Sequence, residues 1–347
     1  MKLPTKILAG TLVLAAAAIA FTSRAQTPPK ADPAMQKVLD ALATLGGKPI
    51  ETLTPAEARR QPTPADAVKK LMTQEGKSTA PDPSVTVKHM NIPGPLGEIP
   101  IHIFTPAGAG PFPVMVYFHG GGFVIADTKT YEASPRALAK GANAIMVAVD
   151  YRLAPEHKFP AAPNDAYAAY LWVLQHAKEF NGDPTRVAVG GESAGGNLAT
   201  VVSMMARDKK AAMPVHQLLV YPVVDNNFET ASYKANANAK PLSKAMMAWF
   251  FKHYATPADA SNPYALPMKA ASLKGLPPAT VITAEIDPLR SEGQAYAQRF
   301  KNDGVAVALQ DYPGVTHEFF GMAAVLPQAK KAQDFAINGL KAAFAKR

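Results

Sequence analysis

Strand-like segments alternate with helical segments over most of the sequence from Ser84 onward. The predicted strands span residues 84–91, 99–104, 113–118, 144–149, 186–189, 217–221, 279–283 and 305–311. The first two lie close together, as in a hairpin, whereas helical stretches such as 162–180, 194–207, 289–302 and 327–344 separate the later ones. Helical crossovers join parallel strands and cover both faces of their sheet. The alternation therefore predicts an α/β fold with a mostly parallel eight-stranded sheet and an antiparallel edge.

Two segments stand outside this alternation. Residues 26–83 are rich in Pro, Ala, Lys and Thr and contain two helical candidates, 33–44 and 55–74. Between residues 225 and 267 the pattern changes to a polar loop followed by the apolar helical segment 244–254. We expect residues 26–83 and this insertion to form a helical cap over the sheet domain, which spans residues 84–347.

The N-terminus has the three regions of a secretory leader. Lys2 and Lys6 precede an apolar run of 15 residues, which leads to Ser23-Arg24-Ala25. This arrangement predicts a signal peptide of residues 1–25, cleaved after Ala25, and a periplasmic or secreted protein. An uncleaved membrane anchor is the alternative, but spanning a bilayer normally takes about 20 apolar residues. We therefore expect no stable membrane anchor after cleavage.

Composition narrows the classes of partner and site. The chain lacks cysteine, which excludes disulfides, thiolate metal sites and lipidation of a cysteine after the leader. The formal charge is +9, but Lys and Arg are scattered among acidic residues and form no basic patch that would indicate a nucleic-acid partner. Nothing in the sequence specifies an oligomeric state.

The pentapeptide at 191–195, Gly-Glu-Ser-Ala-Gly, matches the pattern G-x-S-x-G. It follows the predicted strand 186–189 and opens the predicted helix 194–207. So tight a reversal strains the backbone of the serine, and glycines at the flanking positions avoid clashes with the neighbouring strand and helix. The helix N-terminus directs free N–H groups towards a developing oxyanion. We therefore predict that Ser193 is a nucleophile; an ordinary glycine-rich turn is the alternative.

His119-Gly120-Gly121-Gly122-Phe123 directly follows the predicted strand 113–118. Acyl transfer needs preorganised donors for its tetrahedral intermediate, and glycines let bare N–H groups approach the substrate. We predict that Gly120, Gly121 and Gly122 form an oxyanion hole. A phosphate-binding loop is the competing interpretation, but no Gly-Lys-Ser/Thr sequence follows. His119 is expected to shape the loop and not to act as a base.

A serine nucleophile needs a base. His317 lies in the loop 314–318 after the last predicted strand, at the edge of the sheet where Ser193 is expected. His216 begins a strand and His253 lies in the cap helix, so both are expected to have structural roles.

The base in turn needs an orienting carboxylate. Asp287 follows the predicted strand 279–283, and its loop also ends at the carboxyl edge of the sheet. Asp225 follows the preceding strand in the same way and is a rival, with Glu285 and Asp311 as lesser ones. The order Ser, Asp, His agrees with the nucleophile-elbow pattern.

Several motifs together resemble the hormone-sensitive-lipase-like family of α/β hydrolases, bacterial esterases with an H-G-G-G motif. They occupy residues 119–123, 150–156, 159–162, 191–197, 287–290 and 317–319, in the order of the family. The resemblance implies the α/β-hydrolase fold, the triad Ser193, Asp287 and His317, and oxyanion donors at Gly121, Gly122 and Ala194. The chain departs from the family at Glu192, where Asp is common, and at Ser291, where an acidic residue is common.

These features predict a serine carboxylesterase that hydrolyses short- to medium-chain acyl esters through an acyl-enzyme, with a small-molecule ester as its partner and neither cofactor nor metal. An amidase, a lactonase or a carbohydrate-ester deacetylase would use the same triad, and a ligand-binding receptor without turnover is a further alternative. We expect Phe123, Glu192, Trp249 and Phe250 to line the substrate pocket; packing of the helix 244–254 within the cap is the alternative for the last two.

Overall fold

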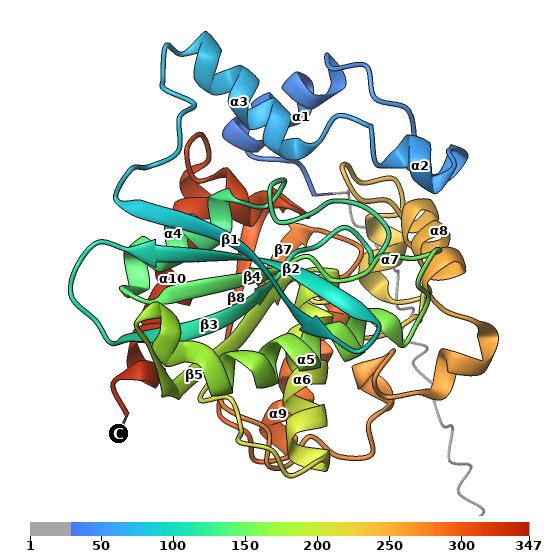
Figure 1. Cartoon of the computed structure of the whole chain (residues 1–347). Helices are drawn as coiled ribbons and strands as arrows, with labels where there is room; N and C mark the ends of the chain where they lie inside the picture. Colours follow the sequence, from blue (N-terminus) through green and yellow to red (C-terminus); the bar gives the residue numbers. More distant parts are fainter. Residues whose placement is uncertain (1–28, 347) are drawn as a thin grey trace, which may run out of the picture.

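The computed structural model describes residues 29–346 and has a twisted sheet at its centre (Figure 1). The sheet has eight strands in the order β1-β2-β4-β3-β5-β6-β7-β8. They are β1 (Val85–Gly94), β2 (Gly97–Pro106), β3 (Phe112–Phe118), β4 (Ile145–Val149), β5 (Gly182–Glu192), β6 (Gln217–Val220), β7 (Ala279–Ile286) and β8 (Val307–Thr316).

The predicted fold class is confirmed. Strands β4, β3, β5, β6, β7 and β8 are parallel to one another. Strands β1 and β2 form an antiparallel hairpin, and β2 pairs antiparallel with β4. Because parallel strands share one direction, the loops that follow β3, β5, β7 and β8 emerge at the same edge of the sheet. The predicted nucleophile, glycine loop, acid and base all lie in these loops.

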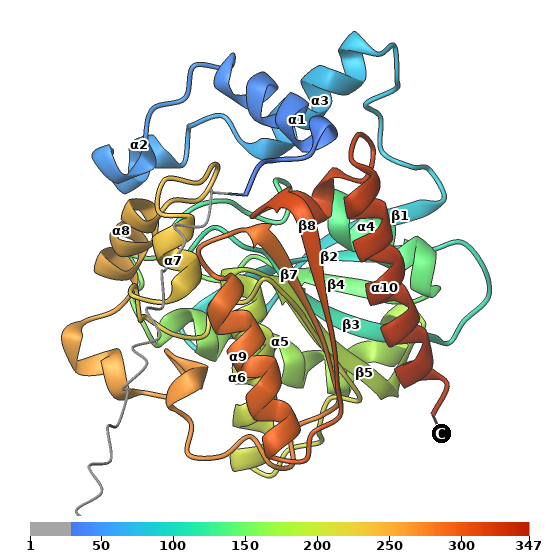
Figure 2. The ribbon, with the colours of Figure 1, turned by 180° about the vertical axis from the view of Figure 1, so that it is seen from behind.

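Helices cover both faces of the sheet: α4 and α10 pack on one face, and α5, α6 and α9 on the other (Figures 1 and 2). The helices are α1 (Pro33–Ala43), α2 (Pro55–Ala58), α3 (Pro64–Gln74), α4 (Ala133–Ala142), α5 (Ala161–His176), α6 (Ala194–Asp208), α7 (Ala231–Ala235), α8 (Lys244–Tyr254), α9 (Arg290–Asn302) and α10 (Pro327–Phe344). Short 3₁₀ helices are η1 (Ile50–Thr52), η2 (Ala177–Phe180), η3 (Pro257–Ser261), η4 (Pro267–Lys269) and η5 (Phe319–Met322).

Strand β3 shows how the sheet divides the core. Val114, Val116 and Phe118 belong to the apolar cluster on the α5 and α6 face, whereas Met115 and Tyr117 belong to the cluster on the α4 and α10 face. Successive side chains of a strand point to opposite faces. A strand buried on both sides is therefore apolar throughout, as the sequence of β3 is.

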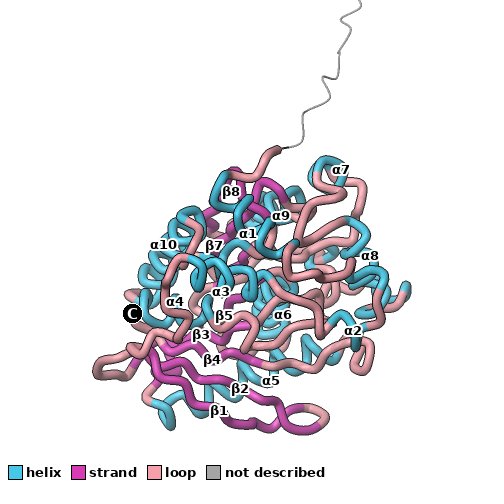
Figure 3. The backbone as a smooth tube through the Cα atoms, turned by 90° about the horizontal axis from the view of Figure 1, so that it is seen from above, coloured by secondary structure: helices cyan, strands magenta, loops and turns pink. Residues whose placement is uncertain are grey.

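The N-terminal helices α1 to α3 lie above the carboxyl edge of the sheet, and α2 lies near α8 of the insertion (Figures 1 and 3). Two side chains join this N-terminal segment to the rest of the chain. The Trp249 indole N–H donates to the Leu53 carbonyl oxygen at 3.1 Å. The Arg59 guanidinium donates to the carbonyl oxygens of Val124 and Ala154, both at 2.8 Å, and binds the Glu156 carboxylate through two N–H groups.

The prediction of one helix over residues 55–74 is wrong. The segment forms α2 and α3, separated by residues 59–63. Thr63 begins α3 as its N-cap, and its side chain and that of Asp66 exchange hydrogen bonds with each other's backbone N–H groups. Pro64 occupies the first turn, where its missing N–H costs nothing. The chain also forms α4 and α7, which the strand pattern did not predict.

The predicted leader falls on residues 1–25, outside the residues that the structure describes. Between residues 29 and 346, no helix is both long and apolar enough to cross a bilayer.

Candidate functional site

Ser193 lies at the turn between β5 and α6, with φ 57° and ψ −116°. A non-glycine residue adopts a positive φ only at a cost of about 1–3 kcal/mol, which the surrounding structure must offset. The Ser193 N–H donates to the Val220 carbonyl oxygen at 2.9 Å, which ties the turn to β6. A methyl group on Gly195 would overlap the Phe118 carbonyl oxygen, so only glycine permits this approach of α6 to β3.

His317 and Asp287 come together with Ser193. His317 follows β8 and Asp287 follows β7, so adjacent strands bring them to the same edge. His317 Nε2 lies 2.9 Å from Ser193 Oγ, and His317 Nδ1 lies 2.7 Å from Asp287 Oδ2. The second carboxylate oxygen of Asp287, Oδ1, accepts from the Leu289 N–H at 2.8 Å. The three side chains thus form a continuous hydrogen-bonded line.

The electrostatics of this line suit a base. Burial lowers the pKa of His317, but the Asp287 carboxylate opposes this, and the pKa of His317 ends above its usual value. The imidazole is 2% exposed. An imidazolium formed here is therefore stabilised by a buried anion at Nδ1, and its Nε2 is free to exchange a proton with the serine.

The glycine loop supplies unpaired donors. Gly121 adopts φ 94°, and its carbonyl oxygen accepts from the N–H groups of Val124 and Ile125 at 3.0 Å, which closes the loop into a tight turn. The N–H groups of Gly120, Gly121, Gly122 and Ala194 donate to no acceptor within residues 29–346. Unpaired N–H groups beside a nucleophile are what a tetrahedral oxyanion requires.

His119 supports the loop from behind. Its ring stacks on Tyr151 at 4.4 Å, and its Nδ1 lies 2.7 Å from the Gly120 carbonyl oxygen. The Tyr151 hydroxyl donates to the His119 carbonyl oxygen at 2.9 Å. Burial lowers the pKa of His119, which favours a neutral ring. These contacts fit the structural role expected for this histidine.

Three of the four expected pocket residues belong to the glycine loop or to α8. Phe250 lies against Gly122, where a methyl group would overlap its ring. Phe123 stacks on Tyr254 at 3.7 Å, and both Trp249 and Phe250 are buried on α8. The apolar side chains of α8 therefore face the loop that carries the unpaired donors.

Glu192 differs from its expected place in the pocket. Its carboxylate accepts hydrogen bonds from the hydroxyl groups of Tyr117, at 2.5 Å, and Tyr221, and the residue is only 1% exposed. Burial raises the pKa of Glu192 to about 7. A residue next to the nucleophile in sequence points the opposite way along the strand. The carboxylate therefore lies beneath the triad, among tyrosines that sequence reasoning did not single out.

Glu318 also belongs to the site and was missed, although it directly follows His317. Its Oε1 accepts from the Tyr131 hydroxyl at 2.6 Å and lies 3.8 Å from His317 Nε2. Burial raises the pKa of Glu318, and His317 opposes this rise. Its place directly after the predicted base was the one signal in the sequence that could have pointed to Glu318. The direction of its side chain, towards Nε2, depends on tertiary contacts.

The rival residues have other partners. Asp225 pairs with Lys269 at 3.2 Å, and Asp311 pairs with Arg290 at 2.6 Å. Glu285 accepts from the Gly314 N–H at 2.7 Å. His216 lies 2.9 Å from the Thr280 hydroxyl, and His253 packs beside Trp249. None of these side chains contacts Ser193.

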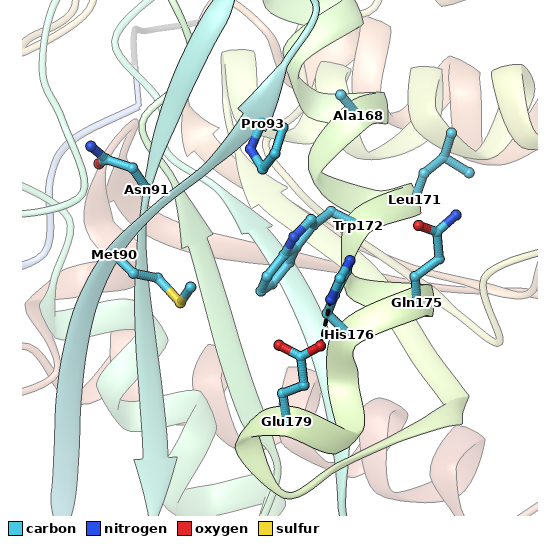
Figure 4. A pocket seen from close by; sticks show the side chains of 9 residues that line it. All are labelled: Met90, Asn91, Pro93, Ala168, Leu171, Trp172, Gln175, His176 and Glu179. Carbon is cyan, nitrogen blue, oxygen red and sulfur yellow. Dashed lines mark hydrogen bonds and ion pairs between the residues drawn. The ribbon is translucent and has the colours of Figure 1, made fainter.

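A groove of about 550 Å³ lies away from this edge, between β1 and α5 (Figure 4). Trp172 lines it and stacks on His176, whose Nδ1 lies 2.7 Å from Glu179. No residue of the triad or the glycine loop lines it. In the part of the chain that the structure describes, no three His, Asp or Glu side chains are grouped so that they could hold a metal ion.

Comparisons with known proteins agree with the fold and show the family. A family model described as alpha/beta hydrolase fold matches residues 115–321. The carboxylic ester hydrolase LipN of Mycobacterium tuberculosis is 43% identical over 70% of this chain and 66% of its own length. The carboxylesterase NlhH of the same organism is 36% identical over 91% of this chain and 97% of its own length. The crystal structure of a thermostable esterase from Pseudomonas putida ECU1011 superimposes with a TM-score of 0.84, at 38% identity over 92% of this chain and 99% of that one.

Proposed function

Because the chain belongs to the hormone-sensitive-lipase-like family of alpha/beta hydrolases and is a carboxylic ester hydrolase, we propose that Ser193, His317 and Asp287 are the residues that hydrolyse its esters. The observation that supports this most directly is the line from Ser193 Oγ through His317 to Asp287, with contacts of 2.9 and 2.7 Å. Nucleophile, base and orienting carboxylate are each within hydrogen-bond distance of the next.

In the first half of the reaction, Ser193 Oγ attacks the ester carbonyl carbon while His317 Nε2 accepts the serine proton. Asp287 holds the imidazole in the required tautomer and stabilises the imidazolium. The carbonyl oxygen gains negative charge, which the unpaired N–H groups of the glycine loop and Ala194 stabilise. His317 then donates its proton to the leaving alcohol as the carbon–oxygen bond breaks, which leaves the acyl group on Ser193.

In the second half, water takes the place of the alcohol. His317 removes a proton from the water, whose oxygen attacks the acyl-enzyme carbonyl, and returns that proton to Ser193 Oγ as the acid leaves. Every proton that His317 takes up is given back within the cycle, so the two half-reactions need no second acid or base. Two successive half-reactions give ping-pong kinetics.

We further propose that the substrates are dissolved esters with short to medium acyl chains. Among residues 29–346, Leu96 is the only large hydrophobic side chain classed as exposed, at 80%. Enzymes that work at an oil–water surface need an apolar face to bind it, and a large exposed patch marks such a site. Ser193 itself is only 4% exposed, so the nucleophile lies in an enclosed site.

The test is turnover of p-nitrophenyl esters from acetate to palmitate by the purified mature protein. We expect kcat/KM to be highest for short chains and to fall by about tenfold or more beyond medium chains, since each extra methylene must fit an enclosed site. A rate that keeps rising to palmitate would contradict the proposal on acyl length. No turnover of any ester by a folded sample would contradict the proposed function itself.

We also propose that the protein is exported and that Gln26 begins its mature form, from the basic, apolar and small-residue regions of residues 1–25. The test is the intact mass of the protein recovered from the periplasm or medium of a bacterial host, which shows whether residues 1–25 have been removed. Protein that stays in the cytoplasm with residues 1–25 attached would exclude it.

A further inference from the structure

Besides Ser193, a second carboxylate lies beside the nitrogen of His317 that faces the nucleophile. Glu318 Oε1 is 3.8 Å from His317 Nε2, the nitrogen that faces Ser193. Asp287 contacts the other nitrogen, Nδ1. The imidazole therefore lies between two carboxylates, and only Asp287 is explained by the mechanism.

Backbone conformation and a hydrogen bond fix the position of Glu318. Glu318 adopts φ 71°, a left-handed conformation that non-glycine residues adopt rarely. The Tyr131 hydroxyl, from the segment before α4, holds its carboxylate at 2.6 Å. Tyr131 in turn packs against Gly120, where a methyl group would overlap the tyrosine hydroxyl. Glu318, Tyr131 and the glycine loop thus form one connected wall beside Nε2.

Glu318 lies on the open side of the triad. Its side chain is 20% exposed, compared with 2% for that of His317. Glu192 is the other carboxylate near the triad, but it is buried and accepts from two tyrosine hydroxyls, so it is unable to touch a substrate. Glu318 Oε2 accepts no hydrogen bond from residues 29–346, so this oxygen is available to a ligand.

An alcohol that takes its proton from His317 must bring its oxygen to about 3 Å from Nε2. Because Glu318 Oε1 is 3.8 Å from the same nitrogen, the substituents of that alcohol pass the carboxylate. A charge at this distance, in a partly enclosed site, discriminates strongly between cations and anions.

We propose that Glu318 determines specificity for the alcohol part of the ester, favouring alcohols that carry a positive charge or a hydrogen-bond donor and disfavouring anionic ones. This inference rests on the proposed function, because it assigns the leaving group to the Nε2 side of the same site. It concerns the alcohol and not the acyl chain of the ester.

The experiment compares three aryl acetates whose meta substituent is neutral, anionic or cationic: phenyl acetate, 3-acetoxybenzoate and 3-acetoxyphenyl-trimethylammonium. Their different sizes and leaving-group reactivities cancel when the variant is compared with the wild type on the same ester. The variant is Glu318→Gln, which removes the charge but keeps an oxygen that accepts from Tyr131. Because burial raises the pKa of Glu318, assays are run on the alkaline side, at about pH 8, where a larger fraction of a carboxyl group is ionised. The measured quantity is the ratio of kcat/KM for the cationic ester to that for the anionic ester. We expect Glu318→Gln to lower this ratio about tenfold, with a smaller change for phenyl acetate.

Two controls isolate the local charge. Glu179→Gln removes a carboxylate from η2, which precedes β5 at the opposite end of the sheet, and should leave the ratio at its wild-type value. Tyr131→Phe removes the hydrogen bond to Glu318 but keeps the charge, so all three rates should change in similar proportion. If circular dichroism shows that Glu318→Gln does not fold, Glu318→Ala is assayed in its place with the same expected fall in the ratio.

A ratio within twofold of wild type in folded Glu318→Gln, with all three rates lowered together, would overturn the inference and leave Glu318 as a support for Tyr131. Phenyl acetate separates this result from a failure of the proposed function. If the wild-type protein turns over none of the three esters, the proposed function is overturned and this inference with it.

Discussion

Replacement of Ser193 by alanine abolishes ester turnover, with an expected fall in kcat of about ten-thousandfold or more. The hydroxyl is the atom that forms the acyl-enzyme, and no neighbouring side chain in the described site supplies another nucleophile 2.9 Å from His317 Nε2. Removing one member of such a triad removes the covalent route as a whole, so the loss is far larger than that of a single hydrogen bond. The measurement is kcat for p-nitrophenyl acetate, with the melting temperature recorded on the same sample.

The fold should survive this change. Alanine fits the turn at φ 57° as well as serine does, and the N–H of residue 193 keeps its hydrogen bond to Val220. Ser203→Ala is the matched control, because Ser203 is a buried serine on α6 whose hydroxyl bonds only to the Ala199 carbonyl oxygen. We expect Ser203→Ala to retain activity within about threefold. Activity of Ser193→Ala near the wild-type level would exclude Ser193 as the nucleophile.

Replacement of Asp287 by asparagine lowers kcat by about ten-thousandfold without unfolding the protein. The Leu289 N–H donates to Oδ1 of this side chain, so an asparagine is oriented with its oxygen towards Leu289 and its amide NH₂ towards His317 Nδ1. Nδ1 must then accept a hydrogen bond, which places the imidazole proton on Nε2. An imidazole in that tautomer is unable to take the proton of Ser193.

Asp225→Asn is the comparison that separates the two candidate acids. Asp225 follows β6 as Asp287 follows β7, but its carboxylate pairs with Lys269 and not with a histidine. We expect Asp225→Asn to keep kcat within about threefold, because a partly exposed ion pair contributes little. A large loss in Asp225→Asn together with mild effects in Asp287→Asn would reverse the assignment of the acid.

Much of this protein could be derived from short-range patterns. The eight strands, the helix Lys244–Tyr254 and the C-terminal helix Pro327–Phe344 all lie where hydrophobic periodicity predicts them. The candidate triad and the glycine loop could be named because each motif directly follows a strand, and parallel strands end at one edge. These predictions depend on backbone geometry that a few neighbouring residues control.

Sequence reasoning failed where the answer depends on neighbours distant in the chain. The break between α2 and α3 depends on a cap that competes with helix propensity, and the periodicity of residues 55–74 conceals it. Glu192 was expected in the pocket, yet hydroxyl groups 75 and 29 residues away hold it beneath the triad. Asp287 was preferred to Asp225 through the family resemblance and not through its position, because both residues follow strands in the same manner.

Local backbone preferences and the direction of parallel strands decide the sheet, the nucleophile turn, the glycine loop and the position of the base in the chain, so these features could be predicted from short stretches of residues. Which carboxylate meets His317 Nδ1 and which one faces Nε2 depends on how distant segments pack together. Glu318 and Tyr131 are 187 residues apart and become partners only after α4 packs on one face of the sheet that contains β8. A contact of that kind depends on packing, hydrogen-bond geometry and burial, none of which can be worked out from a short stretch of residues.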